Sequence, residues 1–193
     1  MSKRFEDKVV IVTGSGSGIG ETTAIRFAEE GAKVIIADIN SETGKKISND
    51  INNKIGKSFF IETDVSDLNS VKNMVDETVK NFGSPDVLIN NAGINVFNEP
   101  LKMSIEEWKR AFSVDLDGVW FGCQSVLPYM VEKKKGAIVN LASVHAIQII
   151  PNCFPYPVAK HGVIGLTKAL AVDYAEKGIK INAISPGYTE TPI

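Results

Sequence analysis

Residues 13–20 read Thr-Gly-Ser-Gly-Ser-Gly-Ile-Gly and directly follow an apolar run rich in Val and Ile. After Gly20 the apolar residues take a helical spacing, and the helix that they predict ends at Gly31, a residue suited to a C-cap. Glycines let the backbone approach a pyrophosphate, and the helix N-terminus offers free N–H groups. A flexible loop is the alternative, but a strand before the turn and a helix after it favour a nucleotide site.

A carboxylate completes this pattern at the end of the next apolar run. Asp38 lies about 18 residues beyond Gly20, where a side chain accepts hydrogen bonds from an adenosine ribose diol. Its charge would repel a 2′-phosphate. The residue before Gly18 is Ser17 and the one after Asp38 is Ile39, so neither position supplies a phosphate-binding cation. We therefore expect the cofactor to be NAD rather than NADP.

The rest of the chain repeats the order strand, helix, strand. Apolar runs that do not alternate with polar residues predict parallel strands buried on both faces. They cover residues 8–13, 33–39, 58–63, 86–90, 137–142 and 180–184. Helical stretches lie between them, and one opens with the capping-box pattern Ser104-Ile-Glu-Glu107. This order predicts one α/β domain over residues 1–193, a doubly wound parallel sheet of Rossmann type in three αβα layers.

Two predicted helices, at residues 111–131 and 158–175, are apolar nearly all round. A helix without a polar face needs cover on both sides, and the sheet covers only one. A homo-oligomer, a dimer or tetramer, is the simplest solution. The alternative is that sheet and loops cover both sides within one monomer.

Composition excludes several classes of protein. The 193 residues are 44% hydrophobic and 23% charged with a net charge of -2, which offers no footprint for nucleic acid. No apolar run is long enough to span a bilayer, and the charged N-terminus predicts a cytoplasmic protein without a signal peptide. Cys123 and Cys153 are isolated, so we expect buried thiols, no disulfide framework and no metal site.

The spacing Gly14-x-x-x-Gly18-x-Gly20 resembles the short-chain dehydrogenase/reductase family. The resemblance continues in order along the chain through Asp64-Val65, Asn90-Asn-Ala-Gly93, Ser143, Tyr156-x-x-x-Lys160 and Pro186-Gly187 to Thr191. Each motif is weak alone, and the ordered set is specific. The resemblance implies an NAD-dependent oxidoreductase that interconverts a secondary alcohol and its ketone. The cofactor-binding residues that it implies are Gly14, Ser17, Gly18, Ile19, Gly20, Asp38, Ile39, Asp64, Val65, Asn91, Ala92, Gly93, Tyr156, Lys160, Pro186, Gly187, Thr189 and Thr191.

The catalytic roles follow the same resemblance. Tyr156 and Lys160, four residues apart, share one helix face. A free Tyr has a pKa near 10, and we expect the nearby ammonium to lower it toward neutrality. Tyr156 would then be the acid/base, Ser143 would hold the substrate oxygen, and Lys160 would tune Tyr156 and bind the nicotinamide ribose. A mononucleotide-binding module of another doubly wound family explains the glycines but not these three residues.

Two features depart from the family. The residue that is usually Asn, and that commonly anchors a water linking the lysine to solvent, is Asp115. Either the proton relay is kept with an altered pH dependence, which we favour, or the protein is a catalytically impaired NAD-binding regulatory or structural protein. In addition, relatives continue beyond the Pro-Gly segment into an edge strand and a substrate lid. The chain ends at Ile193, which leads us to expect a truncated domain.

Three polar residues near the reacting positions predict a polar substrate, such as a sugar, polyol or sugar acid. They are Asn95, His145 and Asn152. Buried polar groups need partners, which a ligand rich in hydroxyls supplies. Two alternatives stay open. Phe97, Ile149, Ile150 and Phe154 could form an apolar wall, and His145 could bond a backbone carbonyl.

Overall fold

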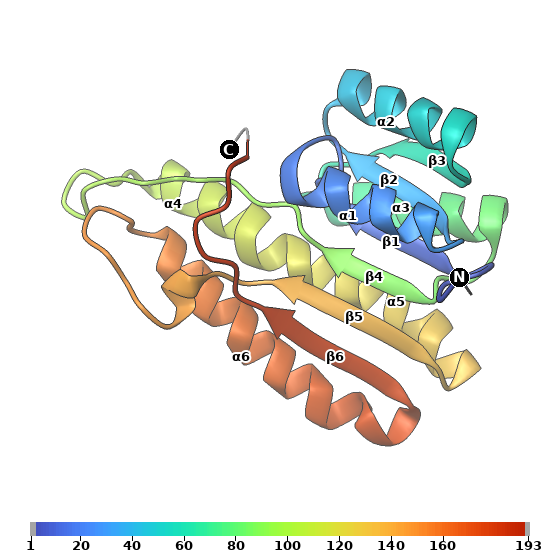
Figure 1. Cartoon of the computed structure of the whole chain (residues 1–193). Helices are drawn as coiled ribbons and strands as arrows, with labels where there is room; N and C mark the ends of the chain where they lie inside the picture. The colour runs from blue at the N-terminus through green and yellow to red at the C-terminus, as the bar shows by residue number, and fades with distance from the viewer. Residues whose placement is uncertain (1–2, 192–193) are drawn as a thin grey trace.

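The computed structural model describes residues 3–191, which build a parallel sheet in the order β3-β2-β1-β4-β5-β6 (Figure 1). Its strands are β1 (Val9–Thr13), β2 (Lys33–Asp38), β3 (Lys57–Glu62), β4 (Val87–Asn90), β5 (Gly136–Leu141) and β6 (Ile179–Ile184). The helices are α1 (Gly18–Glu29), α2 (Ser41–Lys54), α3 (Leu68–Phe82), α4 (Ile105–Phe112), α5 (Gly118–Lys133) and α6 (Tyr156–Tyr174). The strand order reverses between β1 and β4, which is the switch point of a doubly wound sheet.

The six predicted strands are confirmed with bounds that agree to within one residue. Their burial on both faces is confirmed for β1 and β4, in which every residue is buried, whereas β5 is partly half-buried. It is wrong for β3 and β6, the two edges of the sheet. β6 buries Ile179 and Ile181 in the core and leaves Lys180 and Asn182 exposed, because only its α6 side carries a helix (Figure 1).

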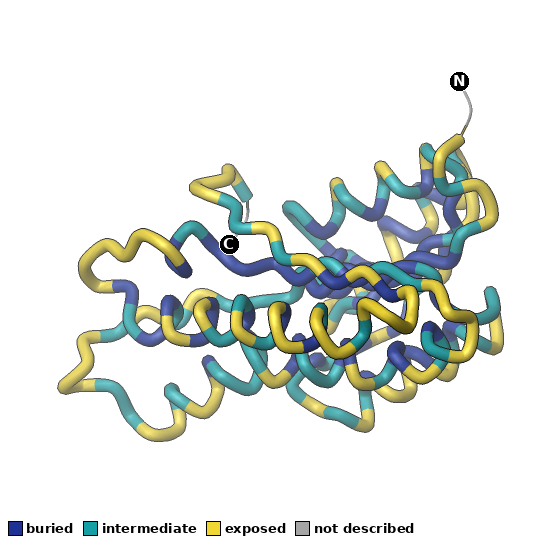
Figure 2. The backbone as a smooth tube through the Cα atoms, turned by 90° about the horizontal axis from the view of Figure 1, so that it is seen from below, coloured by how far each residue is buried: buried dark blue, intermediate teal, exposed yellow. Residues whose placement is uncertain are grey.

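Helices lie on both faces of the sheet, as the sequence predicted. One core joins β1 and β2 to Ala24 of α1 and Ile51 of α2, and a second joins the other face to α3, α5 and α6. β1 supplies both cores, because successive side chains of a strand point to opposite faces. Figure 2 shows the strands largely buried, with the exposed residues of the helices on their outer sides.

The two helices expected to be apolar all round differ in detail from the prediction. The first is α5, preceded by α4 and the π-helical turn Ser113–Asp117. The second, α6, begins at Tyr156 and leaves Val158 and Val172 exposed. Several of their other apolar side chains are half-buried and pack on the α3 side of the sheet. Neighbouring elements of the same chain therefore cover part of each circumference.

The capping box and the burial of the cysteines agree with the sequence predictions. Ser104 and Glu107 form the predicted capping box at the start of α4. Cys123 and Cys153 are buried and unpaired, and burial raises the pKa of the Cys123 thiol to about 12, which makes a reactive thiolate unfavourable. Over residues 3–191 we find no helix with the length and apolarity to cross a membrane, and no group of three or more potential metal ligands.

Candidate active site

The glycine-rich turn packs against the segment after β4 and borders a cavity at the start of α1. Gly14 has φ 63°, and a Cβ there would lie 2.7 Å from the Ala92 Cα. Ser17 is the N-cap residue of α1, and within the described residues its side chain makes no capping hydrogen bond. The backbone N–H groups of the first turn therefore stay available to an anion. These features fit a dinucleotide pyrophosphate.

Gly20, which the sequence also assigned to cofactor binding, packs against the turn. It does not line the cavity beside the turn. Its hydrogen points at the Gly14 carbonyl, where a Cβ would overlap the backbone. Gly20 therefore lets α1 pack closely onto the turn.

Asp38 braces the same turn from the end of β2. Its Oδ2 accepts a hydrogen bond from Gly16 N at 2.6 Å, and its Oδ1 accepts one from Asn40 N at 2.9 Å. The Asn40 side chain in turn caps α2. The carboxylate is thus held at the cavity wall beside Ile39, in the position predicted for a ribose-binding acid.

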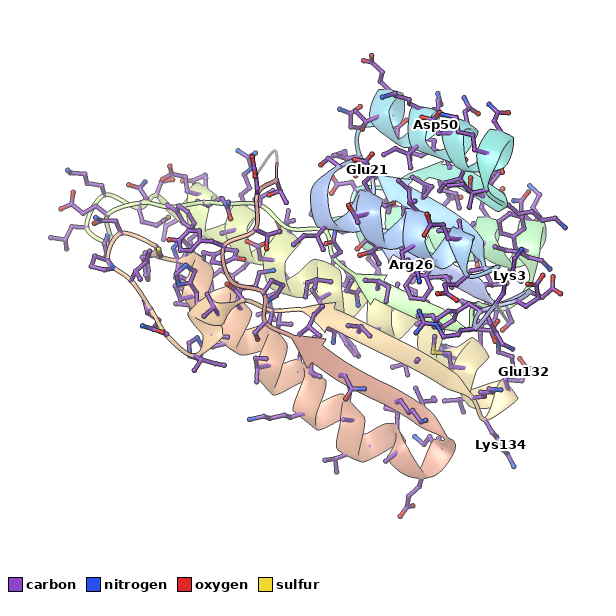
Figure 3. All side chains as sticks on the ribbon, in the orientation of Figure 1. Lys3, Glu21, Arg26, Asp50, Glu132 and Lys134 are labelled. Carbon is purple, nitrogen blue, oxygen red and sulfur yellow. The ribbon has the colours of Figure 1, made fainter. Side chains whose placement is uncertain are left out.

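The predicted site residues come together in one cavity of about 880 Å³ at the carboxyl ends of the strands. Except for Gly20 and Asp115, all of them line it, including both asparagines, His145 and the segment from Pro186 to Thr191. Figure 3 places the labelled charged residues Lys3, Glu132 and Lys134 at the opposite end of the sheet. The predicted site residues therefore lie at the end of the sheet where the carboxyl ends of the parallel strands meet.

Ser143 and Tyr156 meet at the floor of this cavity. Ser143 follows β5 and caps the 3₁₀ turn Val144–Ala146, its Oγ accepting a hydrogen bond from His145 N at 3.1 Å. Tyr156 opens α6. Burial raises the pKa of its phenol, the charge of Asp115 raises it further, and a hydrogen bond with Ser143 lowers it. The sequence predicted a lowered pKa for Tyr156. That prediction is wrong, because burial and the charge of Asp115 outweigh the hydrogen bond with Ser143.

Lys160 lies one turn along α6 from Tyr156, as predicted. Its Nζ lies 5.4 Å from the centre of the Tyr156 ring and donates a hydrogen bond to the Leu141 carbonyl at 3.2 Å. Burial lowers the pKa of this amine, and the charge of Asp115 opposes that shift. The Lys160 Nζ thus lies over the face of the Tyr156 ring.

Asp115 stands behind the cavity in the π-helical turn, completely buried. Its Oδ1 accepts a hydrogen bond from Ile94 N at 2.9 Å and lies 3.8 Å from Lys160 Nζ. Its Oδ2 has no hydrogen-bond partner among residues 3–191. Burial raises the pKa of this carboxyl, and both Lys160 and the Ile94 N–H oppose that rise. Asp115 therefore acts on the site through its charge, which raises the pKa of both Lys160 and Tyr156.

The substrate end of the cavity is mixed in character. His145 is buried, and its Nδ1 lies 3.2 Å from the Gln148 carbonyl, so the backbone bond considered for it is present. Asn95 and Asn152 are exposed at the rim. Of the suggested apolar wall, Phe97 and Ile150 line the cavity, whereas Phe154 packs against Trp108 and Ile149 lies outside.

Sequence reasoning missed several lining residues. Tyr188 lies within the segment that the resemblance had marked, and its ring meets His145 edge-on at 6.4 Å. Arg110, Ser113 and Val114 also line the cavity. Their spacing of three and four residues puts them on one side of a helix, which was a usable signal.

Comparison with known proteins agrees with this geometry. The sequence model of the family described as short chain dehydrogenase matches residues 8–193. Cyclohexanol dehydrogenase of Acinetobacter sp. (strain SE19) is 40% identical over 194 residues, covering 100% of this chain and 77% of that protein. Meso-2,3-butanediol dehydrogenase of Serratia marcescens is 40% identical over 188 residues, covering 97% of this chain and 74% of that protein.

Comparison with a solved structure supports the same relationship. The crystal structure of levodione reductase superposes with a TM-score of 0.92 at 41% sequence identity, covering 98% of this chain and 74% of that one. Both the sequence and the arrangement of strands are thus shared with proteins that are named as dehydrogenases or reductases. The chain belongs to the short-chain dehydrogenase family of oxidoreductases.

Proposed function

We propose that this protein transfers hydride between NAD(H) and a secondary alcohol or the matching ketone. The observation that carries the proposal is the convergence of Ser143, Tyr156 and Lys160 on the cavity that the glycine-rich turn and Asp38 border. A bound nicotinamide ring supplies the hydride acceptor or donor. In oxidation the Tyr156 phenolate would take the hydroxyl proton of the substrate, while the carbinol C–H would give up its hydrogen as hydride.

The chain's own residues position the substrate and handle the proton. The Ser143 Oγ accepts the His145 N–H, which leaves the Ser143 hydroxyl proton to bind the substrate oxygen. Tyr156 takes the alcohol proton in oxidation and returns one to the carbonyl oxygen in reduction. Lys160, held on the Leu141 carbonyl beside Tyr156, is the group that would bind the nicotinamide ribose.

The experiment is to follow NADH absorbance with a panel of secondary alcohols and ketones. The alternative is a catalytically impaired NAD-binding regulatory or structural protein. The buried, incompletely bonded carboxylate of Asp115 is the observation in its favour. Tight NADH binding without turnover of any compound would support that alternative and contradict the proposal.

We expect NAD(H) to bind at least tenfold more tightly than NADP(H), a difference of about 1.4 kcal/mol. The Asp38 carboxylate is held at the cavity wall by Gly16 N and would face a 2′-phosphate as a like charge. Titration of intrinsic fluorescence gives both dissociation constants. In Asp38→Asn, which keeps the acceptor oxygen but removes the charge, the gap should narrow. Equal or tighter binding of NADP by the unchanged chain would contradict the prediction.

We propose a polar substrate, a sugar, polyol or sugar acid, for the same cavity. Support comes from His145, Asn95 and Asn152, which line it together with the reacting residues. One relative at 40% identity is named for a diol, which is consistent with this class, and another is named for an apolar alicyclic alcohol. Phe97 and Ile150 form the apolar part of the wall and would pack against the carbon skeleton.

We also propose that the protein assembles as a homo-oligomer, a dimer or tetramer, through α5 and α6. Val158 and Val172 stay exposed on α6, and burial of such side chains between copies is favourable. Light scattering at micromolar concentration should return a multiple of the chain mass. Val172→Asp should weaken the assembly, whereas Lys46→Glu on the exposed side of α2 should not. A monomer mass for the complete protein would contradict the prediction.

A further inference from the structure

His145 is held in one orientation on the wall of the cavity, next to the reacting residues. Its ring meets the Tyr156 ring edge-on, with 6.2 Å between the centres. Its backbone N–H is bound to the Ser143 Oγ at 3.1 Å, so His145 and Ser143 belong to the same short turn. The ring lies inside the molecule, with 8% of the residue exposed. The His145 side chain therefore lines the cavity beside Ser143 and Tyr156, the two residues at which the substrate oxygen is proposed to bind.

The partner of Nδ1 decides which ring nitrogen carries the proton. Nδ1 lies 3.2 Å from the Gln148 carbonyl oxygen, and a carbonyl oxygen can only accept. Nδ1 is therefore the donor, and in the neutral ring Nε2 keeps a lone pair. Within residues 3–191, Nε2 makes no hydrogen bond. The cavity thus contains a fixed hydrogen-bond acceptor that the hydride-transfer mechanism does not use.

Building on the proposed function, we propose that His145 Nε2 accepts a hydrogen bond from a second hydroxyl of the substrate, carried by the carbon next to the reacting carbon. The reacting oxygen is bound between Ser143 and Tyr156, and His145 borders both. The preferred substrates are accordingly vicinal diols and α-hydroxy ketones.

The Nε2 acceptor of His145 also distinguishes among the proposed polar substrates, which are sugars, polyols and sugar acids. A hydroxyl donates to a lone pair, whereas a carboxylate or an ether oxygen at the same place brings only lone pairs of its own. The position next to the reacting carbon therefore favours a hydroxyl over the carboxylate of a sugar acid. A mono-alcohol leaves Nε2 without a partner, and an unpaired group of this kind typically lowers specificity by about 10- to 100-fold.

The test uses three alcohols with one carbon skeleton: 2,3-butanediol, 3-methoxy-2-butanol and 2-butanol. With the full chain and NAD, we expect kcat/KM for the diol to exceed that for each of the other two at least tenfold. The methoxy compound keeps the second oxygen but cannot donate, so it separates hydrogen-bond donation from the mere presence of a second oxygen. A diol advantage shared by the methoxy compound would overturn the inference.

Two histidine variants locate the effect. His145→Phe keeps the ring but removes the acceptor, and it should bring the ratio of diol to 2-butanol to within about threefold of one. His161→Phe is the matched control, because His161 bonds the Pro157 carbonyl through Nδ1 at 2.7 Å and does not line the cavity. That variant should keep the wild-type ratio. NADH binding by each variant confirms that it is folded.

The outcomes distinguish this inference from the function on which it rests. Turnover of 2-butanol and the diol at equal kcat/KM would overturn the inference and leave the proposed function standing. An unchanged ratio in His145→Phe would do the same. No NAD-dependent turnover of these three alcohols, their ketones or any compound of the wider panel of secondary alcohols and ketones would overturn both.

Discussion

Replacing Tyr156 with Phe should reduce turnover about 10²- to 10⁴-fold, the usual contribution of a positioned acid/base, while NADH binding stays nearly intact. The change removes one hydroxyl from the floor of the cavity and keeps the ring that packs edge-on against Phe97, with 5.8 Å between centres. The phenol hydrogen-bonds Ser143, the residue proposed to hold the substrate oxygen, so the lost hydroxyl is the proposed partner for proton exchange with that oxygen. The measurement is kcat in both directions, with the NADH dissociation constant from fluorescence.

Tyr188→Phe is the matched control for that loss. Tyr188 also lines the cavity and also meets His145 edge-on, but its side chain is largely exposed and contacts neither Ser143 nor Lys160 in the described chain. We expect its turnover to stay within a few-fold of wild type. Activity that survives in Tyr156→Phe would show that the catalytic assignment is wrong.

Asp115→Ala should destabilise the folded chain by about 3–5 kcal/mol, the usual cost of removing one partner from a buried ion pair. Lys160 and Asp115 are almost completely buried with 3.8 Å between Nζ and Oδ1, and the Ile94 N–H would also lose its acceptor. Asp115→Asn keeps an oxygen for Ile94 N and should lose less stability. Urea unfolding measures the three free energies. Equal stability of Asp115→Ala and the unchanged chain would contradict this.

The variant Asp115→Asn should also change the pH dependence of alcohol oxidation. The negative charge of Asp115 raises the pKa of Tyr156, so removing it in Asp115→Asn should lower that pKa. Alcohol oxidation needs the phenolate, and its rising limb in kcat against pH should therefore move to lower pH. The charged groups involved are Asp115 in the π-helical turn and Lys160 on α6, with the His145 ring beside Tyr156.

Asp117→Asn controls for charge alone, because Asp117 is exposed at the end of the same turn. Its profile should match that of the unchanged chain. A limb that stays in place or moves to higher pH in Asp115→Asn would contradict the assigned role of Asp115.

The fold could be predicted from local patterns because each pattern acts over a few residues. Apolar runs determine where strands form, the glycine turn places α1, and the Ser104–Glu107 box starts α4. The site could be located for the same reason. Asp38, Ser143 and the Pro186 segment each follow a parallel strand, so they lie together at the carboxyl ends of the strands. The burial of β3 and β6 was predicted wrongly, because a run of residues does not show whether a strand lies at the edge of its sheet.

The sequence by itself determined the order of the elements, the family and most of the residues around the cavity, because spacing along the chain maps directly onto turns, helix faces and strand ends. Only the tertiary structure decided the chemical state of those residues. The pKa of Tyr156 depends on burial and on Asp115, which lies far from it along the chain. The acceptor at His145 depends on the Gln148 carbonyl, and the role of Gly20 depends on its packing against Gly14. Desolvation and charge interactions are set by distances in space, and spacing along the chain does not encode them.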